Sequence, residues 1–242
     1  PATVYDIGVA DPHHSFIANT QSAHNCVSQG FGHGSDLLAC IEIAIGGEHE
    51  EFRYTSTEAI YGMARVDIGG GRINGDGAVG AWAAKAVNTL GTVSRDITGP
   101  YDGAKARSWG SRGVPADVKS KAADHKIRTV SLVSTWDELT VAIANGYPVA
   151  ICSNQGFTLA RDANGFCHPS GVWNHCMLIV GIRTDKPGAC IMNSWGNDTP
   201  SGPIALDQPS CSFWAEPNIV ARILGQGDSW AISGFDGYPA QP

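Results

Sequence analysis

The order of hydrophobic patterns along the chain limits its possible folds more than any other feature. In the first half, apolar residues recur near helical spacing in three stretches, at 26–45, 55–68 and 79–90. A further helix is expected to end at Asn145-Gly146, and strands are expected after it at 148–153, 175–183 and 189–195. A helical first half followed by a strand-rich second half predicts an α+β fold of two lobes with a cleft between them.

Local signals predict where two of these helices begin and end. Thr55 and Glu58 fit a capping box that opens the second helix, and the glycines at 69–71 close it. Ser134 with Asp137 is predicted to cap the later helix.

One glycine-rich stretch matches the residue pattern of a nucleotide-binding motif. Residues 75–80 read GDGAVG and fit the pattern G-x-G-x-x-G, but GGGRIN rather than a hydrophobic strand precedes them. We therefore interpret 75–80 as a loop, and we expect no cofactor.

Charge and composition exclude several classes of protein. The net charge is -7 and no run of Lys or Arg occurs, so we expect no nucleic-acid partner. The longest apolar stretches, such as 176–182, are too short to span a bilayer, and the N-terminus lacks the pattern of a signal peptide. The expectation is a cytoplasmic protein with no membrane partner.

The seven cysteines do not follow the pattern of a disulfide framework. Their number is odd, no CxxC pair occurs and no export signal precedes them. Cys167, His168, His175 and Cys176 can be drawn as a metal cluster, but their spacing fits no familiar zinc site. We therefore expect free thiols and no bound metal.

Residues 1–25 form a separate unit. A β-rich run at 4–9, an Asp11-Pro12 turn and a short run at 16–18 predict a β-hairpin that ends in His24-Asn25, directly before Cys26. The Asn25 amide can attack its own main-chain carbonyl and cut the following bond, while His24 polarises that carbonyl or protonates the leaving amine. The Cys26 thiol is a nucleophile that can receive an acyl group. This order predicts a protein-splicing junction.

The same unit resembles the C-terminal end of inteins. VYDIGV at 4–9, HSFIAN at 14–19 and HNC at 24–26 match the closing blocks of that family in order. The resemblance implies that Asn25 cyclises, that His24 assists it and that Cys26 is the first extein residue. It also places Asp6 and His14 where they support the junction chemistry. The alternative is an ordinary hairpin with a surface histidine and a deamidation-prone asparagine.

The first nucleophile and most of the β-rich body of an intein do not occur in this sequence. We therefore expect a C-terminal half whose partner is a complementary intein N-terminal fragment with its N-extein. A chain that begins at Pro1 is compatible with removal of an initiator Met, although a truncated chain has the same appearance.

A second group of residues has the chemistry of a nucleophilic enzyme. Cys26 begins a predicted helix, whose positive end lowers the pKa of a thiol. His175, at the start of a predicted strand, can form a thiolate-imidazolium pair with it, and Asn193 on the neighbouring predicted strand can orient the imidazole.

This second group resembles the papain family of cysteine peptidases. WNHCMLIVG at 173–181 and IMNSWG at 191–196 are close to the family's His and Asn motifs, and 57–60 and 74–80 resemble its mid-domain. The resemblance covers most of 26–235. It implies a papain-like domain at 26–242, with a helical lobe and a β-rich lobe, that hydrolyses peptide bonds through Cys26, His175 and Asn193.

Two departures from the papain pattern affect the functional prediction. Val27 stands where the family usually has Trp, and the family's oxyanion-hole Gln, six residues before its nucleophile, is replaced by Thr20. Gln21 is one position away and lies inside the intein-like unit. We expect that an intein interrupts the peptidase just before its catalytic Cys, so that only the spliced product is a competent enzyme.

Three classes of function remain open at this point. The chain is a splicing precursor of a peptidase, a peptidase with an N-terminal extension, or a degenerate papain-like domain used for binding or structure. The intact junction at 24–26 favours the first class over the second, and the retained Cys, His and Asn favour an enzyme over the third. We expect a peptide or protein substrate.

Overall fold

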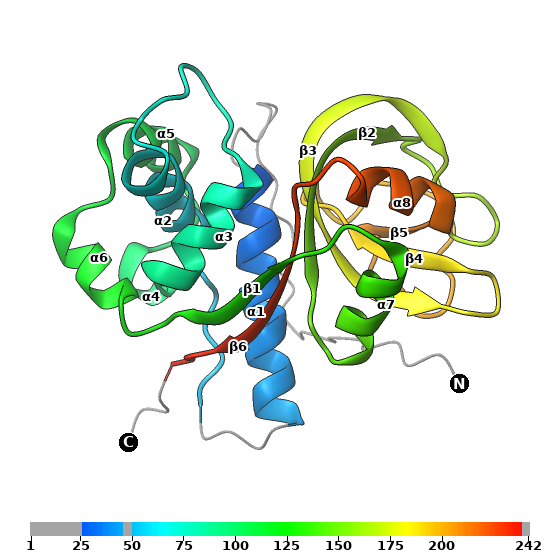
Figure 1. Ribbon diagram of the computed structural model, residues 1–242, viewed down its shortest axis with the longest axis horizontal. Coiled ribbons are helices and arrows are strands. Elements are labelled where there is room, and N and C mark those ends of the chain that lie inside the picture. The colour runs from blue at the N-terminus through cyan, green and yellow to red at the C-terminus, as the bar shows by residue number, and fades with distance from the viewer. Residues whose placement is uncertain (1–25, 46–49, 239–242) are drawn as a thin grey trace.

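Helix α1 (Cys26–Ala44) lies between the two halves of the molecule (Figure 1). The computed structural model describes residues 26–45 and 50–238. α1 contacts α2 and α3 (bounds below) on one side and strands β2, β3 and β6 on the other. The helix predicted to begin at or just after Cys26 is confirmed.

Glycines along α1 allow this close packing on both sides. A Cβ atom at Gly30 would lie 2.7 Å from Cys176 Sγ, and one at Gly34 would lie 2.6 Å from Ile232 Cδ1. On the opposite side, a Cβ atom at Gly32 would lie 2.6 Å from Thr57 Cγ2. Glycine costs about 1 kcal/mol relative to alanine inside a helix, and here it lets α1 approach both lobes.

The first lobe is helical. Its elements are α2 (Thr57–Gly62), which continues into the π-helix η1 (Met63–Ile68), α3 (Gly80–Thr89), α4 (Arg95–Thr98), α5 (Gly103–Arg112) and α6 (Ala116–Ala122). The helices expected at 55–68 and 79–90 are confirmed, and 75–79 is a loop, as interpreted from the sequence. The short helices α4 to α6 were not predicted.

The second lobe is built on an antiparallel sheet with the strand order β1-β6-β2-β3-β4-β5. Figure 1 shows α7 and α8 on this lobe, while β1 and β6 pass between the lobes. The elements are β1 (Ile127–Leu132), α7 (Trp136–Ala144), β2 (Val149–Phe157), β3 (Pro169–Arg183), β4 (Gly188–Met192), β5 (Ser212–Ala215), α8 (Pro217–Leu224) and β6 (Ser229–Phe235). The α+β class with a helical half and a sheet half is confirmed.

Two hydrophobic clusters make up most of the core of the described residues. One surrounds α1 and includes Phe31, Ile60 and Phe235. The other fills the space between the sheet and helices α7 and α8, and includes Ile151 and Ile223. Burial of apolar area contributes roughly 25 cal/mol per Å². The first cluster also contains Leu178 and Ile232 of the sheet, so it joins the helical lobe to the sheet, whereas the second stabilises the sheet lobe itself.

The strand boundaries differ from the predicted ones because only part of a strand is buried, and the apolar pattern in the sequence marks only that part. β3 starts at Pro169, but its residues are mostly exposed until His175 and mostly buried afterwards. The hydrophobic pattern therefore showed only the buried part. β4 ends at Met192, so Asn193 lies just after the strand on which it was expected.

Both predicted helix caps are wrong in detail. Ser56, the N-cap of α2, makes no side-chain cap hydrogen bond, and the Glu58 side chain turns instead to an ion pair with Arg95. The capping box of α7 is formed by Thr135 with Glu138, one residue after the predicted pair. Thr135 takes the cap because its hydroxyl accepts from the Glu138 N–H at 3.2 Å.

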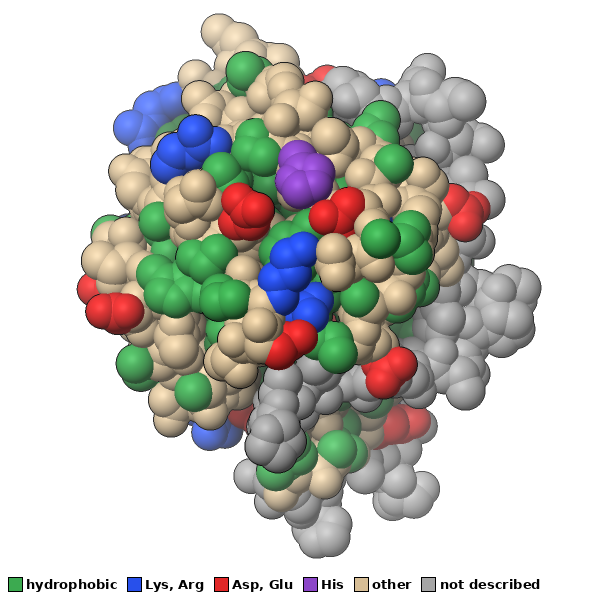
Figure 2. Space-filling model, turned by 90° about the vertical axis from the view of Figure 1, so that its right-hand side faces the viewer, with side chains coloured by type: hydrophobic (Ala, Val, Ile, Leu, Met, Phe, Trp, Pro, Cys, Tyr) green, Lys and Arg blue, Asp and Glu red, His purple; other side chains and the backbone are tan. Residues whose placement is uncertain are grey.

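The described surface carries charges of both signs. Figure 2 shows acidic and basic side chains interspersed with apolar and polar ones on the face that lies on the right in Figure 1. Within the described residues, no helix is both long enough and apolar enough to cross a bilayer.

Candidate active site

Cys26 and His175 line one cavity of about 510 Å³. The lining comes from the start of α1, from the loop before α3, from β2 and β3, and from the segment before β6: Cys26, Val27, Asp76, Gly77, Ala78, Cys152, Ser153, Asn154, Asn174, His175, Gln226 and Asp228. Residues from both lobes therefore surround the predicted nucleophile and base. The cleft expected from the sequence is present, and it contains both predicted side chains.

Asn193 holds the imidazole of His175. The two side chains meet at 2.8 Å between His175 Nε2 and Asn193 Oδ1, and both are buried. The backbone N–H of Ser194 also donates to Oδ1 at 2.8 Å, which identifies this atom as the amide oxygen. His175 must therefore carry its proton on Nε2, and Nδ1 is left as the ring nitrogen that can accept a proton.

Trp195 adds a contact that the sequence reasoning did not assign. Its ring stacks on His175 with centroids 4.7 Å apart and an interplanar angle of 27°. Trp173 packs against Trp195 in turn, at 4.6 Å between centroids. The ring of His175 is thus fixed by a hydrogen bond at its edge and an aromatic side chain on its face. In the sequence, the signal for this contact was the position of Trp195, two residues after Asn193.

The protonation states differ from the sequence-based expectation. Burial raises the pKa of the Cys26 thiol, whereas backbone N–H groups of Cys176 and Val27 act in the opposite direction. Burial also lowers the pKa of His175, partly offset by its bond to Asn193. The predicted lowering of the Cys26 pKa by the helix end is therefore wrong for this structure, because the cost of burying the thiolate is larger. Both shifts favour the uncharged forms, a neutral thiol and a neutral imidazole.

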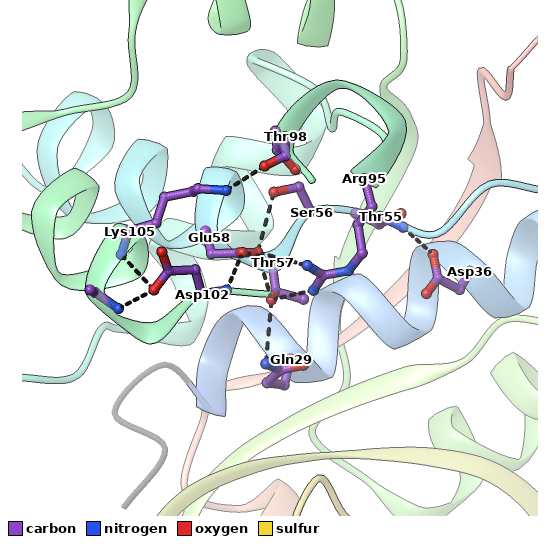
Figure 3. Close-up of polar contacts among 11 residues, drawn as sticks. Gln29, Asp36, Thr55, Ser56, Thr57, Glu58, Arg95, Thr98, Asp102 and Lys105 are labelled. Carbon is purple, nitrogen blue, oxygen red and sulfur yellow. Dashed lines mark hydrogen bonds and ion pairs between the residues drawn. The ribbon is translucent and has the colours of Figure 1, made fainter. Parts of the chain in front are cut away.

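A buried polar network ties the start of α1 to the helical lobe (Figure 3). Gln29, one turn after Cys26, donates from Nε2 to Thr57 Oγ1 at 3.3 Å, and Arg95 Nη2 donates to the same hydroxyl at 3.2 Å. Arg95 Nη1 lies 3.1 Å from the fully buried carboxylate of Glu58, which also accepts the Asp102 N–H at 2.9 Å. The network therefore connects the helix that carries Cys26 with the starts of α2, α4 and α5.

The charged side chains that line the cavity are acidic. Asp76 and Asp228 belong to the lining, and no Lys or Arg does among the described residues. Asp228 also joins the two lobes, since its Oδ2 accepts the Gly80 N–H at 2.8 Å and its Oδ1 accepts the Trp230 indole N–H at 2.7 Å. The cavity is thus an environment that favours neutral or positively charged groups.

The other candidate residues take ordinary positions or lie outside the described chain. All seven cysteines are free thiols. Within 26–45 and 50–238, no group of three or more His, Cys, Asp or Glu side chains is arranged to hold a metal ion. The residues assigned to splicing, namely Asp6, His14, His24 and Asn25, lie outside the described residues, as do Thr20 and Gln21.

Solved structures supply the comparison for this geometry. No protein-family model and no curated protein matches the sequence. The structure of Xylellain, a cysteine protease from Xylella fastidiosa, matches with a TM-score of 0.63 and 19% identity, over 86% of this chain and 79% of that one. The described part of the chain has a papain-like fold.

Two further papain-like structures agree with this result. A cysteine protease from Carica candamarcensis matches with a TM-score of 0.52 and 18% identity, over 88% of this chain and 91% of that one. Digestive procathepsin L 3 from the larval midgut of Tenebrio molitor matches with a TM-score of 0.53 and 17% identity, over 94% and 67%. At these identities, the likeness concerns the fold.

Proposed function

We propose that this papain-like domain is a cysteine peptidase with Cys26 as nucleophile, His175 as general base and Asn193 as the residue that orients the base. The observation that carries the proposal is the bond of 2.8 Å from His175 Nε2 to Asn193 Oδ1, which leaves Nδ1 free on a ring that shares a cavity with Cys26. A thiol, an imidazole and a group that orients the imidazole are the parts required for acyl transfer through a thioester.

The reaction begins from the neutral pair. Nδ1 of His175 takes the proton of the Cys26 thiol as the sulfur attacks the peptide carbonyl, and it then gives this proton to the leaving amine. Water, activated by the same nitrogen, hydrolyses the thioester and restores the thiol. Burial supports this order of steps, because it disfavours the Cys26 thiolate and the His175 imidazolium before a substrate is bound.

The substrate is a peptide segment that is neutral or basic where it enters the cavity. Asp76 and Asp228 supply negative charge on the cavity wall, and a carboxylate on the substrate would be repelled there. Peptides with Lys or Arg beside the scissile bond are therefore expected to be cleaved faster than the same peptides with Glu.

We also propose that residues 1–25 make the chain a splicing precursor, with a complementary intein N-terminal fragment and its N-extein as partner. This proposal rests on the sequence of 4–9, 14–19 and 24–26. Cys26 then has two successive roles, first as acyl acceptor at the splice junction and then as peptidase nucleophile. The spliced product is the active form, because the N-extein supplies the oxyanion-hole donor, and one such donor contributes about 100-fold to 1000-fold in turnover.

Splicing and hydrolysis can be tested separately because different residues carry them. The Asn25→Ala chain mixed with the complementary half should show no release of residues 1–25 by intact-mass spectrometry, since no succinimide can form. Ligated product free of residues 1–25 from this variant would show that Asn25 does not cyclise.

The His175→Ala chain should splice normally but give a product that does not hydrolyse a denatured protein substrate. General-base catalysis typically contributes about 100-fold to 10,000-fold, whereas Asn193→Ala, which removes one hydrogen-bond partner, should cost about 10-fold to 100-fold. His168→Ala is the matched control, because that imidazole is half exposed and lies outside the cavity lining. Equal losses for His168→Ala and His175→Ala would contradict the assignment of the base.

A non-catalytic binding domain is the alternative. It is favoured if the spliced product reacts stoichiometrically with a thiol alkylating agent at Cys26 and yet cleaves no member of a diverse peptide library.

A further inference from the structure

Two thiols that the proposed peptidase reaction does not use lie opposite each other beside the cavity. Cys152 on β2 and Cys176 on β3 are direct partners in the antiparallel register. The N–H of Cys152 donates to Asp228 O at 3.0 Å, on the side away from β3. Cys152 and Cys176 are therefore a pair without mutual backbone hydrogen bonds, for which the Cα atoms are about 4.5 Å apart and both side chains point to one face.

This arrangement meets the geometric requirement for a disulfide. Disulfides join residues whose Cα atoms are about 4.4 to 6.8 Å apart, and Cys152 and Cys176 are direct register partners with both side chains on one face of the sheet. Helices α1 and α3 also limit the space around both sulfurs. Cys176 Sγ lies against Gly30 of α1 and Cys152 Sγ against Gly80 of α3, each 2.7 Å from where a Cβ atom would be. Both sulfurs therefore lie between the sheet and these two helices.

The two thiols differ in access to solvent. Cys152 is partly exposed and lines the cavity, whereas Cys176 is only 1% exposed. A small reagent that enters the cavity therefore reaches Cys152 first. Burial raises the pKa of Cys176, and its interactions with Cys152 act in the same direction, so Cys176 is a poor nucleophile toward reagents in solution.

We propose that Cys152 and Cys176 are a reversible redox pair, which a small disulfide such as oxidised glutathione converts into a cross-strand disulfide at the edge of the cavity. This site is distinct from the peptidase residues and does not depend on peptidase activity.

The chemistry is two steps of thiol-disulfide exchange. The Cys152 thiolate attacks one sulfur of the small disulfide, forms a mixed disulfide and releases the first thiolate. Cys176 then loses its proton and attacks Cys152 Sγ, which expels the second thiolate. Two protein thiols are oxidised, one small disulfide is reduced to two thiols, and the two cysteine protons go to the released thiolates. The second step is intramolecular, which compensates for the high pKa of Cys176.

Cys26 lies in the same cavity as Cys152, so the same oxidant can reach both thiols. Only Cys152 faces a second cysteine across the sheet. A mixed disulfide on Cys152 is resolved by its register partner Cys176. We therefore expect the cross-link to join Cys152 with Cys176 and not to include Cys26.

The test is disulfide mapping of the full chain after incubation with oxidised glutathione. Remaining thiols are alkylated in acid-quenched samples, and peptides are separated without reduction and identified by mass spectrometry. The expected result is one cross-linked peptide pair, Cys152 with Cys176, with Cys26 absent from any cross-link and the cross-link reversed by dithiothreitol. A sample oxidised in denaturant should give several pairings instead.

Variants separate the two steps. Cys176→Ala should stop at one glutathione adduct on Cys152, and Cys152→Ala should leave Cys176 unreacted. Cys40→Ala is the matched control, since this thiol is partly exposed on α1, and it should leave the cross-link yield unchanged. A disulfide between Cys26 and Cys152, or separate adducts without a cross-link in the native parent chain, overturns the proposal. The parent result does not depend on whether the variants fold.

Discussion

Replacing Glu58 by Gln should destabilise the helical lobe far more than its place at the start of a helix suggests. The carboxylate of Glu58 is fully buried and accepts from four donors: Arg95 Nη1 at 3.1 Å, the Asp102 N–H at 2.9 Å, the Ser56 hydroxyl at 3.3 Å and the Thr57 hydroxyl at 3.5 Å. Glutamine keeps the shape but loses the charge, and its NH₂ group replaces one of the two oxygens that accept these hydrogen bonds. It therefore leaves a mostly buried Arg95 without its anion.

The size of the effect follows from burial. Removing one partner of a buried ion pair costs about 3 to 5 kcal/mol. If Glu58 were the capping-box residue that the sequence predicts, the loss would be that of a helix cap, about 1 kcal/mol. The two interpretations therefore differ by at least about 2 kcal/mol in the free energy of unfolding, which is measurable.

Urea denaturation of the full chain, followed by far-ultraviolet circular dichroism, measures the difference. Asp67→Asn is the matched control, because it makes the same change of charge in a pair with Lys119 that is partly exposed on both sides, and such pairs contribute about 0 to 1 kcal/mol. We expect a clear fall in the midpoint for Glu58→Gln and almost none for Asp67→Asn. Midpoints that fall equally in the two variants would refute the argument from the buried ion pair.

Two further predictions concern stability. Gly91→Ala should be strongly destabilising, since φ is +90° and a Cβ atom would lie 1.9 Å from Ala122 O. Gly99→Ala has open space around it and should cost only the backbone strain of its conformation, φ +77° and ψ −177°, about 1 to 3 kcal/mol; equal thermal midpoints would contradict this. Burial raises the pKa of Asp36 to about 7, above the unfolded value of about 3.9, so the folded state binds the extra proton and stability falls as pH rises between these values. Asp36→Asn should therefore flatten the loss of stability between about pH 4 and about pH 7, and an unchanged slope in urea midpoints would show that Asp36 is not its source.

The sequence was sufficient for those parts of the fold that depend on local periodicity. The start of α1 at Cys26, the helix around Val79 to Leu90 and the buried half of β3 from His175 each have a regular apolar pattern, and all are present. The hydrogen bond between His175 and Asn193 joins residues that the motif alone had paired.

The features that the sequence did not predict depend on contacts between distant segments. Glu58 fits a capping box locally, but Arg95, 37 residues later, takes its carboxylate. The pKa of Cys26 was expected to be lowered by the helix end, but burial between the lobes raises it. The pairing of β1 with β6 joins residues about a hundred positions apart, from Leu132 with Trp230 to Ile127 with Phe235, and leaves no local signal. In each case, tertiary contacts outweighed the local sequence preference.

We propose that splicing at Cys26 produces an active papain-like peptidase. The most direct measurement mixes the chain with its complementary half and follows two quantities in the same samples: release of residues 1–25 by mass spectrometry, and hydrolysis of a denatured protein substrate. Rates are divided by the titrated amount of reactive Cys26 thiol. We predict almost no hydrolysis at the start and a rise in proportion to ligated product. Full activity in the unspliced chain, or a ligated product that is alkylated at Cys26 and cleaves nothing, would contradict the claim.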